Sequence, residues 1–167
     1  MRQWVITDTH FLDTKLGVAC SRPANFTERI IKGWKREVLP EDLIIHLGDI
    51  GNTDIIPSLP GCKVLVRGNH DKHSNNWYYI HGWDFVVESF SFIRSKKIVL
   101  ISHKPQPDLG QFDYNIHGHF HNTDYVNKDP ICAALLTAKH YLYALEYHGY
   151  CPLLLDTLLS KHFHLFC

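Results

Sequence analysis

The sequence lacks the features that mark membrane proteins and disulfide-rich secreted proteins. No apolar run approaches the roughly 18 to 20 residues of a membrane-spanning helix, because Asp, His, Lys or Gly interrupts each one. The five cysteines are odd in number, widely spaced and include no Cys-x-x-Cys pair, which favours reduced thiols over a disulfide framework or a thiolate zinc site. The amino end reaches Asp8 before an apolar signal segment could form. These absences argue against membrane insertion and predict a cytoplasmic protein.

An excess of charge of one sign is also missing. Seventeen Lys and Arg residues balance 17 Asp and Glu residues, so the formal net charge is +0 and no basic field favours duplex nucleic acid. The chain shows no internal repeat, low-complexity tract or linker, and 45% of its residues are hydrophobic. Its 167 residues predict one domain spanning residues 1–167 around one core. The apolar segment 153–159 closes this core or forms a dimer contact, so the oligomeric state stays open.

Hydrophobic periodicity predicts alternating strands and helices. Apolar and β-branched runs predict strands over 3–7, 43–47, 62–67, 84–93, 97–102, 113–116 and, by alternation of tyrosines, about 140–147. Helical spacing predicts a helix over 26–38, with Asn25 and Glu28 as a capping box, a helical turn over 54–59 and a closing helix over 153–159. The first elements form a strand, helix, strand unit of the kind found in α/β proteins.

Histidine is abundant, with 13 residues, and many of these histidines fall in motifs that follow predicted strands. The motifs are Asp8-x-His10, Gly48-Asp49, Gly68-Asn69-His70-Asp71, Ser102-His103 and Gly118-His119-x-His121. Loops after strands are where α/β sheets gather functional residues. Carboxylates, an amide oxygen and imidazoles together suit two metal ions that share a bridging carboxylate, and they suit Mn, Fe, Zn, Co or Ni better than Mg or Ca.

Local geometry supports this hypothesis. Glycines before Asp49, Asn69 and His119 allow tight turns close to a metal ion. His119 and His121 are two residues apart, so in an extended segment they would point to opposite sides and serve two neighbouring ions.

The five motifs, in this order over residues 3–121, resemble those of the calcineurin-like metallophosphoesterase family. The phrases Thr7-Asp8-Thr9-His10-Phe11 and Arg22-Pro23 are similar to those of small single-domain phosphoesterases of bacteria and phages. The resemblance implies an α/β (α+β) fold, a four-layer αββα sandwich of two mixed β-sheets flanked by helices. It also implies a metal site at one edge of the sandwich.

The resemblance further implies a role for each motif residue. One metal ion would be held by Asp8, His10, Asp49 and His121, and the second by Asp49, Asn69, His103 and His119. A hydroxide between the two divalent transition-metal ions would attack phosphorus in line with the leaving oxygen. His70 would assist the leaving group as a catalytic acid, oriented by Asp71. We take Mn2+ as the first choice, with Fe, Zn, Ni or Co as alternatives.

We therefore expect a metal-dependent phosphoesterase, a hydrolase acting on phosphate ester bonds. A phosphodiesterase is favoured, because the short chain has no room for a cap domain that would enclose a small monoester. The expected substrates are small phosphate esters, nucleotides among them. A phosphomonoesterase or nucleotide pyrophosphatase is the alternative within the fold. A non-catalytic metal-binding scaffold is a further alternative, although it would leave the retained ligands and His70 without a purpose.

Some residues near the motifs allow two interpretations each. Arg67 and Lys104 either contact a substrate phosphate or lie in solvent. The aromatic segment 73–79 either stacks a base or forms a helical core face. His46 and His117 are interpreted as packed histidines, with contacts to the metal ligands as the alternative.

Overall fold

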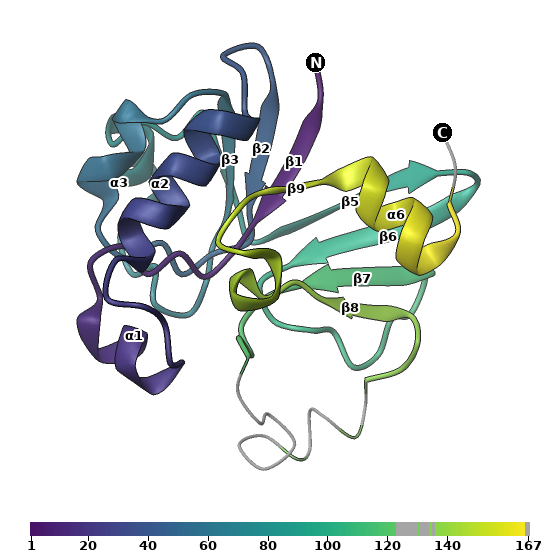
Figure 1. Ribbon diagram of the computed structural model, residues 1–167. Coiled ribbons are helices and arrows are strands. Elements are labelled where there is room, and N and C mark those ends of the chain that lie inside the picture. The colour runs from purple at the N-terminus through teal and green to yellow at the C-terminus, as the bar shows by residue number, and fades with distance from the viewer. Residues whose placement is uncertain (123–129, 131–133, 135, 166–167) are drawn as a thin grey trace.

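The computed structural model describes residues 1–122, 130, 134 and 136–165, and its strands form two sheets. The first sheet contains β1 (Gln3–Ile6), β2 (Leu43–His46), β3 (Cys62–Val66), β4 (Phe85–Val87) and β9 (Leu153–Leu154). The second contains β5 (Ser89–Arg94), β6 (Lys97–Ser102), β7 (Tyr114–His117) and β8 (His140–Leu142). The strand order is β4-β3-β2-β1-β9 in the first sheet and β5-β6-β7-β8 in the second (Figure 1).

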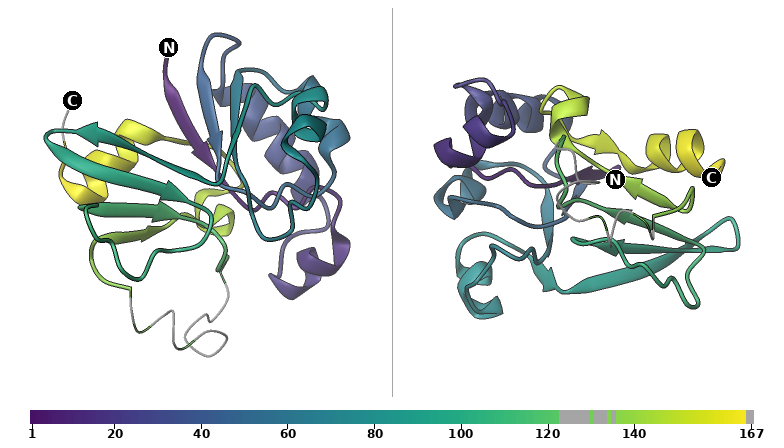
Figure 2. Two further views of the ribbon diagram at one scale, coloured as in Figure 1. Left: turned by 180° about the vertical axis from the view of Figure 1, so that it is seen from behind. Right: turned by 90° about the horizontal axis from the view of Figure 1, so that it is seen from below.

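Both sheets are mixed. In the first, β1 to β4 are parallel, with Val5 opposite Ile45 and Ile45 opposite Val64, whereas β9 is antiparallel to β1. In the second, β6, β7 and β8 are parallel and β5 pairs antiparallel with β6. Figure 2 shows the two sheets from behind and from below. Because the carboxyl ends of parallel strands meet at one edge of a sheet, this topology gathers the loops that carry the sequence motifs.

The helices are α1 (Thr14–Ala19), α2 (Phe26–Glu37), η1 (Thr53–Ser58), α3 (Asn75–Ile80), η2 (Leu145–His148) and α6 (Leu155–Phe163). α2 and α3 lie beside the first sheet and α6 lies beside the second (Figure 1). α2 buries Phe26, Ile30 and Trp34 at helical spacing, which anchors it in the core. The predicted α/β fold of two mixed sheets flanked by helices is confirmed.

The apolar carboxyl-terminal segment closes the core. Leu155, Leu158, Leu159 and Phe163 are buried on α6, and the Phe163 ring stacks on Tyr114 of β7 with ring centroids 4.2 Å apart. Positions 166–167 of the apolar tail lie outside the described residues. No helix in the described part of the chain is both long and apolar enough to cross a membrane.

In the amino-terminal half, one short helix was not predicted and the capping-box prediction is wrong. Residues 8–25 contain α1, where no helix was expected, and Asp13 caps it by accepting a hydrogen bond from the Leu16 N–H at 3.0 Å. Asn25 precedes α2 as predicted, but its side chain accepts from Arg29 Nε instead of capping the helix, so no capping box forms. A local side-chain partner has outcompeted the backbone N–H groups.

The predicted strand over 140–147 is also wrong beyond Leu142. Tyr143 still donates its backbone N–H to His117 O at 2.8 Å, but the chain then turns into η2, which ends at Gly149 in the left-handed conformation. The Tyr150 N–H donates back to Leu145 O at 3.1 Å and closes this turn. This turn places Glu146 3.4 Å from His121 of the last motif loop.

Candidate active site and metal centre

The structure brings the predicted motif residues together from loops that follow β1, β2, β3, β6 and β7. Their side chains form two groups in which the potential ligand atoms lie within 4.8 Å of one another: Asp8 with His10 and His121, and Asp49 with His103 and His119. Such groups of carboxylates and imidazoles could each hold a divalent cation.

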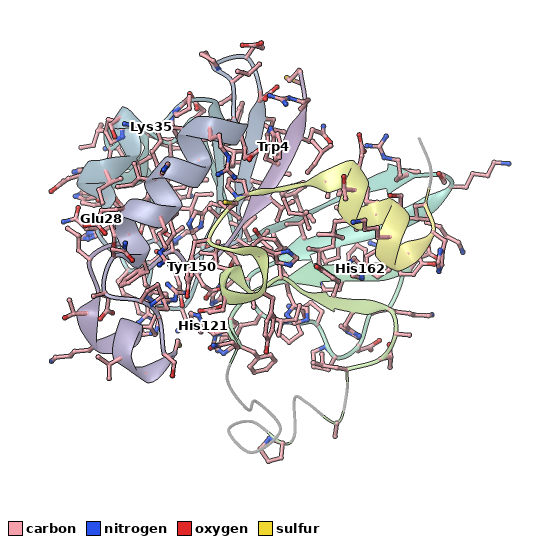
Figure 3. All side chains as sticks on the ribbon, viewed as in Figure 1. Trp4, Glu28, Lys35, His121, Tyr150 and His162 are labelled. Atoms are coloured by element: carbon pink, nitrogen blue, oxygen red, sulfur yellow. The ribbon has the colours of Figure 1, made fainter. Side chains whose placement is uncertain are left out.

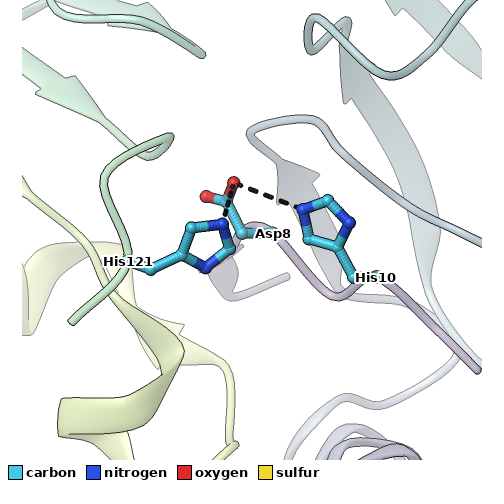
Figure 4. Close-up of side chains that lie close together, drawn as sticks. All are labelled: Asp8, His10 and His121. Atoms are coloured by element: carbon cyan, nitrogen blue, oxygen red, sulfur yellow. Dashed lines mark ion pairs between the residues drawn. The ribbon is translucent and has the colours of Figure 1, made fainter. Parts of the chain in front are cut away.

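The first group is buried beneath the end of β1. Asp8 Oδ1 lies 3.6 Å from His121 Nε2 and 4.0 Å from His10 Nε2 (Figure 4). Among the described residues, Asp8 Oδ1 and His10 Nε2 are buried without any hydrogen-bond partner. Buried polar atoms are rarely left without a hydrogen-bond partner. These two atoms lie 4.0 Å apart, so a cation that contacts both would satisfy them.

The second group is held in place by the backbone. His103 Nδ1 donates to Leu47 O at 2.7 Å, which turns Nε2 toward Asp49 Oδ2 at 3.4 Å and Asn69 Oδ1 at 2.9 Å. A backbone partner on one ring nitrogen fixes the tautomer that presents the other nitrogen to a metal ion.

Asp49 lies between the two groups. Its Oδ2 is 3.4 Å from His103 Nε2 and 3.7 Å from His10 Nε2, so one carboxylate oxygen faces an imidazole of each group. Its Oδ1 accepts the backbone N–H of His70 at 2.8 Å, which orients the carboxylate.

The loops that carry these side chains have an unusual backbone. Positive φ angles occur at Asp8 (48°), His10 (42°), Asp49 (59°), His119 (77°) and His121 (53°). Such angles are uncommon outside glycine and are concentrated at functional sites. His119 and His121 do reach different groups, as predicted, but through left-handed turns and not through the extended segment on which that prediction was based.

Glycine is required where these loops approach one another. A Cβ added at Gly118 would overlap Thr7 Oγ1 and Asp8 Oδ2, and a Cβ at Gly68 would overlap the Asp49 carboxylate. The predicted tight turn needs glycine at Gly48, whose φ is 100°, whereas Gly68 and Gly118 are needed for close approach of the loops.

The pKa values of His10, His119 and Asp8 favour the protonation states that metal binding needs. Burial lowers the pKa of His103, but its contact with Asp49 and the charge of Asp8 raise it overall. Burial lowers the pKa of His10 to about 4 despite the attraction of Asp8, and burial with repulsion from His103 lowers that of His119 to about 4. Burial raises the pKa of Asp8, but the attraction of His121 and His103 outweighs it, so the pKa is lowered overall. Neutral imidazoles and ionised carboxylates are the forms that ligate cations.

The Asp71 carboxylate accepts hydrogen bonds from backbone N–H groups. Its Oδ2 accepts the backbone N–H groups of Asp49 and Gly68, each at 2.8 Å, and its Oδ1 accepts that of Ile50 at 3.1 Å. Among the described residues, neither oxygen contacts the His70 ring. Asp71 instead ties the loop after β2 to the loop after β3, because its buried carboxylate satisfies backbone donors of both.

Comparison with known proteins decides the family. A sequence model of the calcineurin-like phosphoesterases matches residues 1–150. The chain belongs to this family. It is therefore a metal-dependent phosphoesterase, a hydrolase acting on phosphate ester bonds.

The chain is similar to one curated protein and to two solved structures. The uncharacterized protein MJ1445 of Methanocaldococcus jannaschii is 29% identical over 131 residues, which cover 71% of this chain and 68% of that protein. Among solved structures, the protein of unknown function AQ665 from Aquifex aeolicus has a TM-score of 0.70 at 23% identity, covering 91% of this chain and 94% of its own, and so shares the fold. A structure described as a novel archaeal phosphodiesterase has a TM-score of 0.47 at 18% identity and covers 73% and 74% of the two chains.

Two residues of this phosphoesterase were not predicted as part of the site. Arg22 is fully buried and donates to Asp8 O at 2.8 Å and Thr9 O at 3.1 Å. It also pairs with Glu146 Oε1 at 2.7 Å, and Glu146 in turn lies 3.4 Å from His121 Nδ1. His121 lies near η2, which carries Glu146 (Figure 3). The Arg22-Pro23 phrase was a sequence signal that could have pointed to Arg22. No sequence signal pointed to Glu146, which lies 124 positions away.

Glu146 affects the imidazole that faces Asp8. Burial lowers the pKa of His121, but contacts with Cys20 and Glu146 and the charge of Asp8 raise it to about 10. Burial raises the pKa of Glu146, yet His121 and Arg22 lower it overall. A carboxylate behind a ligating histidine orients the ring and makes its far nitrogen a stronger ligand.

His46 is a satisfied core histidine, as interpreted, and His117 is buried as well. His46 Nδ1 accepts from the Gly48 N–H at 3.0 Å and Nε2 meets Thr9 Oγ1 at 2.9 Å, so the ring is satisfied while it holds the loop before Asp49. His117 is fully buried, with Nδ1 3.0 Å from Gly118 O, while its Nε2 has no hydrogen-bond partner among the described residues.

In the aromatic segment after the third motif, Trp77 and Tyr78 pack against the core while the other residues are exposed. Both faces of the Trp77 ring are covered, by His73 at 3.7 Å and His81 at 3.6 Å between ring centroids. Tyr78 is buried. The hypothesis that Trp77 or Tyr78 stacks a base is therefore not supported.

Proposed function

We propose that this phosphoesterase is a phosphodiesterase that works with two divalent transition-metal ions. The observation that carries the proposal is the Asp49 carboxylate, which stands between two separate groups of potential ligands. The donor atoms fit such ions, because Asp8 Oδ1 and His10 Nε2 are buried polar atoms that a cation would satisfy. The mixture of oxygen and nitrogen donors suits Mn2+ as the first choice, with Fe, Zn, Ni or Co as alternatives.

Each ion is assigned its ligands from these groups. The first would be held by Asp8, His10, Asp49 and His121, and the second by Asp49, Asn69, His103 and His119. When bound, two such cations supply the positive charge that polarises a phosphate ester and lowers the pKa of a water molecule for in-line attack on phosphorus.

His70 is placed to act on the leaving group. Its side chain is 66% exposed, and its Nε2 lies 4.0 Å from Asp49 Oδ2, beside the carboxylate shared by the two groups. We assign it the transfer of a proton to the leaving oxygen. Asp71 is assigned a positioning role, since it holds the loops of Asp49 and His70 together.

The surface next to the site favours a diester over a monoester. A pocket of about 360 Å3 is lined by Asn69 and His103, and another of about 300 Å3 is lined by His70 and Asp71. A phosphodiester carries two organic groups, and each would find a pocket beside the loop 68–71. With the leaving group next to His70, the retained group would occupy the pocket at Asn69.

The test is hydrolysis of bis(p-nitrophenyl) phosphate and of p-nitrophenyl phosphate by metal-stripped protein resupplied with Mn2+. We expect faster turnover of the diester and loss of turnover in Asp49→Asn, which retains the shape of the side chain but not its charge. A preference for the monoester would move the function to a phosphomonoesterase. If neither substrate were hydrolysed with Mn2+, Fe2+, Zn2+, Ni2+ or Co2+, the catalytic proposal would be wrong and a metal-binding scaffold would replace it.

A further inference from the structure

The pocket at Asn69 and His103 has a chemical character of its own. It is formed by the end of β3, the start of β5 and the segment that follows β6, and its volume is about 360 Å3. None of the residues that line it is Phe, Tyr or Trp. It therefore offers hydrogen-bonding and charged groups to the part of a substrate that it holds, and no aromatic platform for a base.

Two cationic side chains line this pocket, and they differ in how they are paired. Arg67 Nη1 lies 3.1 Å from Glu88 Oε1, and its Nη2 donates to Asp71 O at 2.9 Å. Lys104 is exposed, and within the described part of the chain its ammonium group makes no hydrogen bond or ion pair. Glu88 is the acidic residue of the lining, so it offsets Arg67 and leaves the charge of Lys104 uncompensated.

The segment that carries Lys104 is anchored by its backbone. Ser102 Oγ donates to Lys104 O at 2.6 Å, and buried Asn115 accepts the Gln106 N–H at 2.9 Å through Oδ1. His140 Nε2 lies 2.8 Å from Gln106 O on the other side. Since the backbone is fixed on both sides of Pro105, little further ordering is needed to place Lys104 at the pocket.

We propose that this pocket binds a second anionic group of the substrate, a phosphate on the retained group, with Lys104 as the residue that selects for it. The substrate class is then a phosphodiester that bears a further phosphate, as in a 5′-phosphate ester of a nucleoside bisphosphate or an oligonucleotide end. The inference rests on the proposed function, because the pocket acts on a substrate whose scissile phosphate lies at Asp49. Arg67 contributes less, since Glu88 shares its charge.

The test compares two chromogenic diesters that differ by one phosphate. They are thymidine 5′-(p-nitrophenyl phosphate) and the same compound with a 3′-phosphate, and both release p-nitrophenol. We expect the 3′-phosphate to raise kcat/KM by about three- to fivefold at low ionic strength, as for a partly exposed ion pair. The gain should fall as salt is added, because the contact is electrostatic and open to solvent.

Variants assign this gain to one residue. Lys104→Gln should abolish the gain while leaving hydrolysis of the unmodified diester within about twofold, and Lys104→Arg should restore it. Lys35→Gln is the matched control, because Lys35 is an exposed lysine on α2, away from His121 in Figure 3, and should keep the gain.

The outcomes separate this inference from the proposed function. Metal-dependent hydrolysis of both diesters with equal kcat/KM would overturn the phosphate subsite and leave the phosphodiesterase intact. An equal loss of the gain in Lys104→Gln and Lys35→Gln would also overturn it, because the effect would then be one of overall charge. If neither diester were hydrolysed while bis(p-nitrophenyl) phosphate also failed, the proposed function itself would fall. Where the 3′-phosphate does raise kcat/KM, comparing hydrolysis of a short oligonucleotide with that of a nucleoside bisphosphate ester distinguishes the two sources of the second phosphate.

Discussion

Arg22 and Glu146 form a buried ion pair that we expect to couple folding to metal binding. Arg22 Nη2 lies 2.7 Å from Glu146 Oε1, with the side chains 0% and 5% exposed. Arg22 also donates to the carbonyl oxygens of Asp8 and Thr9, directly beneath the first ligand group. Removing either partner of such a pair leaves a buried charge uncompensated, which typically costs about 3 to 5 kcal/mol.

The hydrogen-bond partners left in each variant determine how far its free energy of unfolding falls. Glu146→Gln should lower the free energy of unfolding of the metal-free protein by about 3 kcal/mol, because the remaining guanidinium still has two carbonyl partners. Arg22→Met should lower it by about 4 kcal/mol, since it leaves those carbonyls unpaired as well as the carboxylate. The double variant should lose about 4 kcal/mol and not about 7, which is a coupling energy of about 3 kcal/mol.

Urea unfolding of the four proteins, followed by circular dichroism, measures this coupling. Mn2+ affinity provides a second readout, and Arg22→Met should weaken it about 10- to 100-fold because the backbone of Asp8 loses its support. A coupling energy below about 1 kcal/mol would refute the reasoning. So would an unchanged Mn2+ affinity in Arg22→Met, which would show that the pair acts on folding alone.

Further predictions follow from the loops and the buried groups. Gly118→Ala should abolish tight Mn2+ binding, measured by calorimetry, because the added Cβ displaces the Asp8 carboxylate; retained affinity would show that the loop can move aside. Asp71→Asn should lower the free energy of unfolding by about 1 to 3 kcal/mol, because an amide has one acceptor oxygen for three backbone donors, and an unchanged urea midpoint would contradict this. Burial lowers the pKa of His46 to about 3, so its neutral form contributes stability that is complete above the unfolded pKa near 6.5. As the pH falls toward 3, the free energy of unfolding should decrease by about 1.4 kcal/mol per pH unit. His46→Gln should flatten this pH dependence, and an equal slope in the variant and the wild type would exclude His46 as its source. His70→Ala should slow diester turnover about 100-fold or more while metal content stays unchanged; equal turnover would remove His70 from the mechanism.

Much of the site could be predicted from the sequence, because its residues occur as short motifs at the ends of strands. Asp8, Asp49 and His103 each follow a buried apolar run closely, and parallel strands place their carboxyl ends at one edge. Periodicity also located most strands and the helix over 26–37, since burial on one face leaves a repeat in the sequence. The motif order was sufficient to identify the family.

The remaining features depend on contacts between distant segments, and only the tertiary structure decided them. Glu146 reaches Arg22 across 124 positions, and it does so because the chain forms η2 where alternation predicted a strand. The Asp71 carboxylate accepts hydrogen bonds from the backbone of two loops that pack together. The Trp77 ring is covered by two histidine rings. The sequence by itself determined which chemical groups stand at the strand ends, because that order is local. Their hydrogen-bond partners were decided by folding, because a buried polar group takes whichever donor or acceptor the packed chain brings within reach.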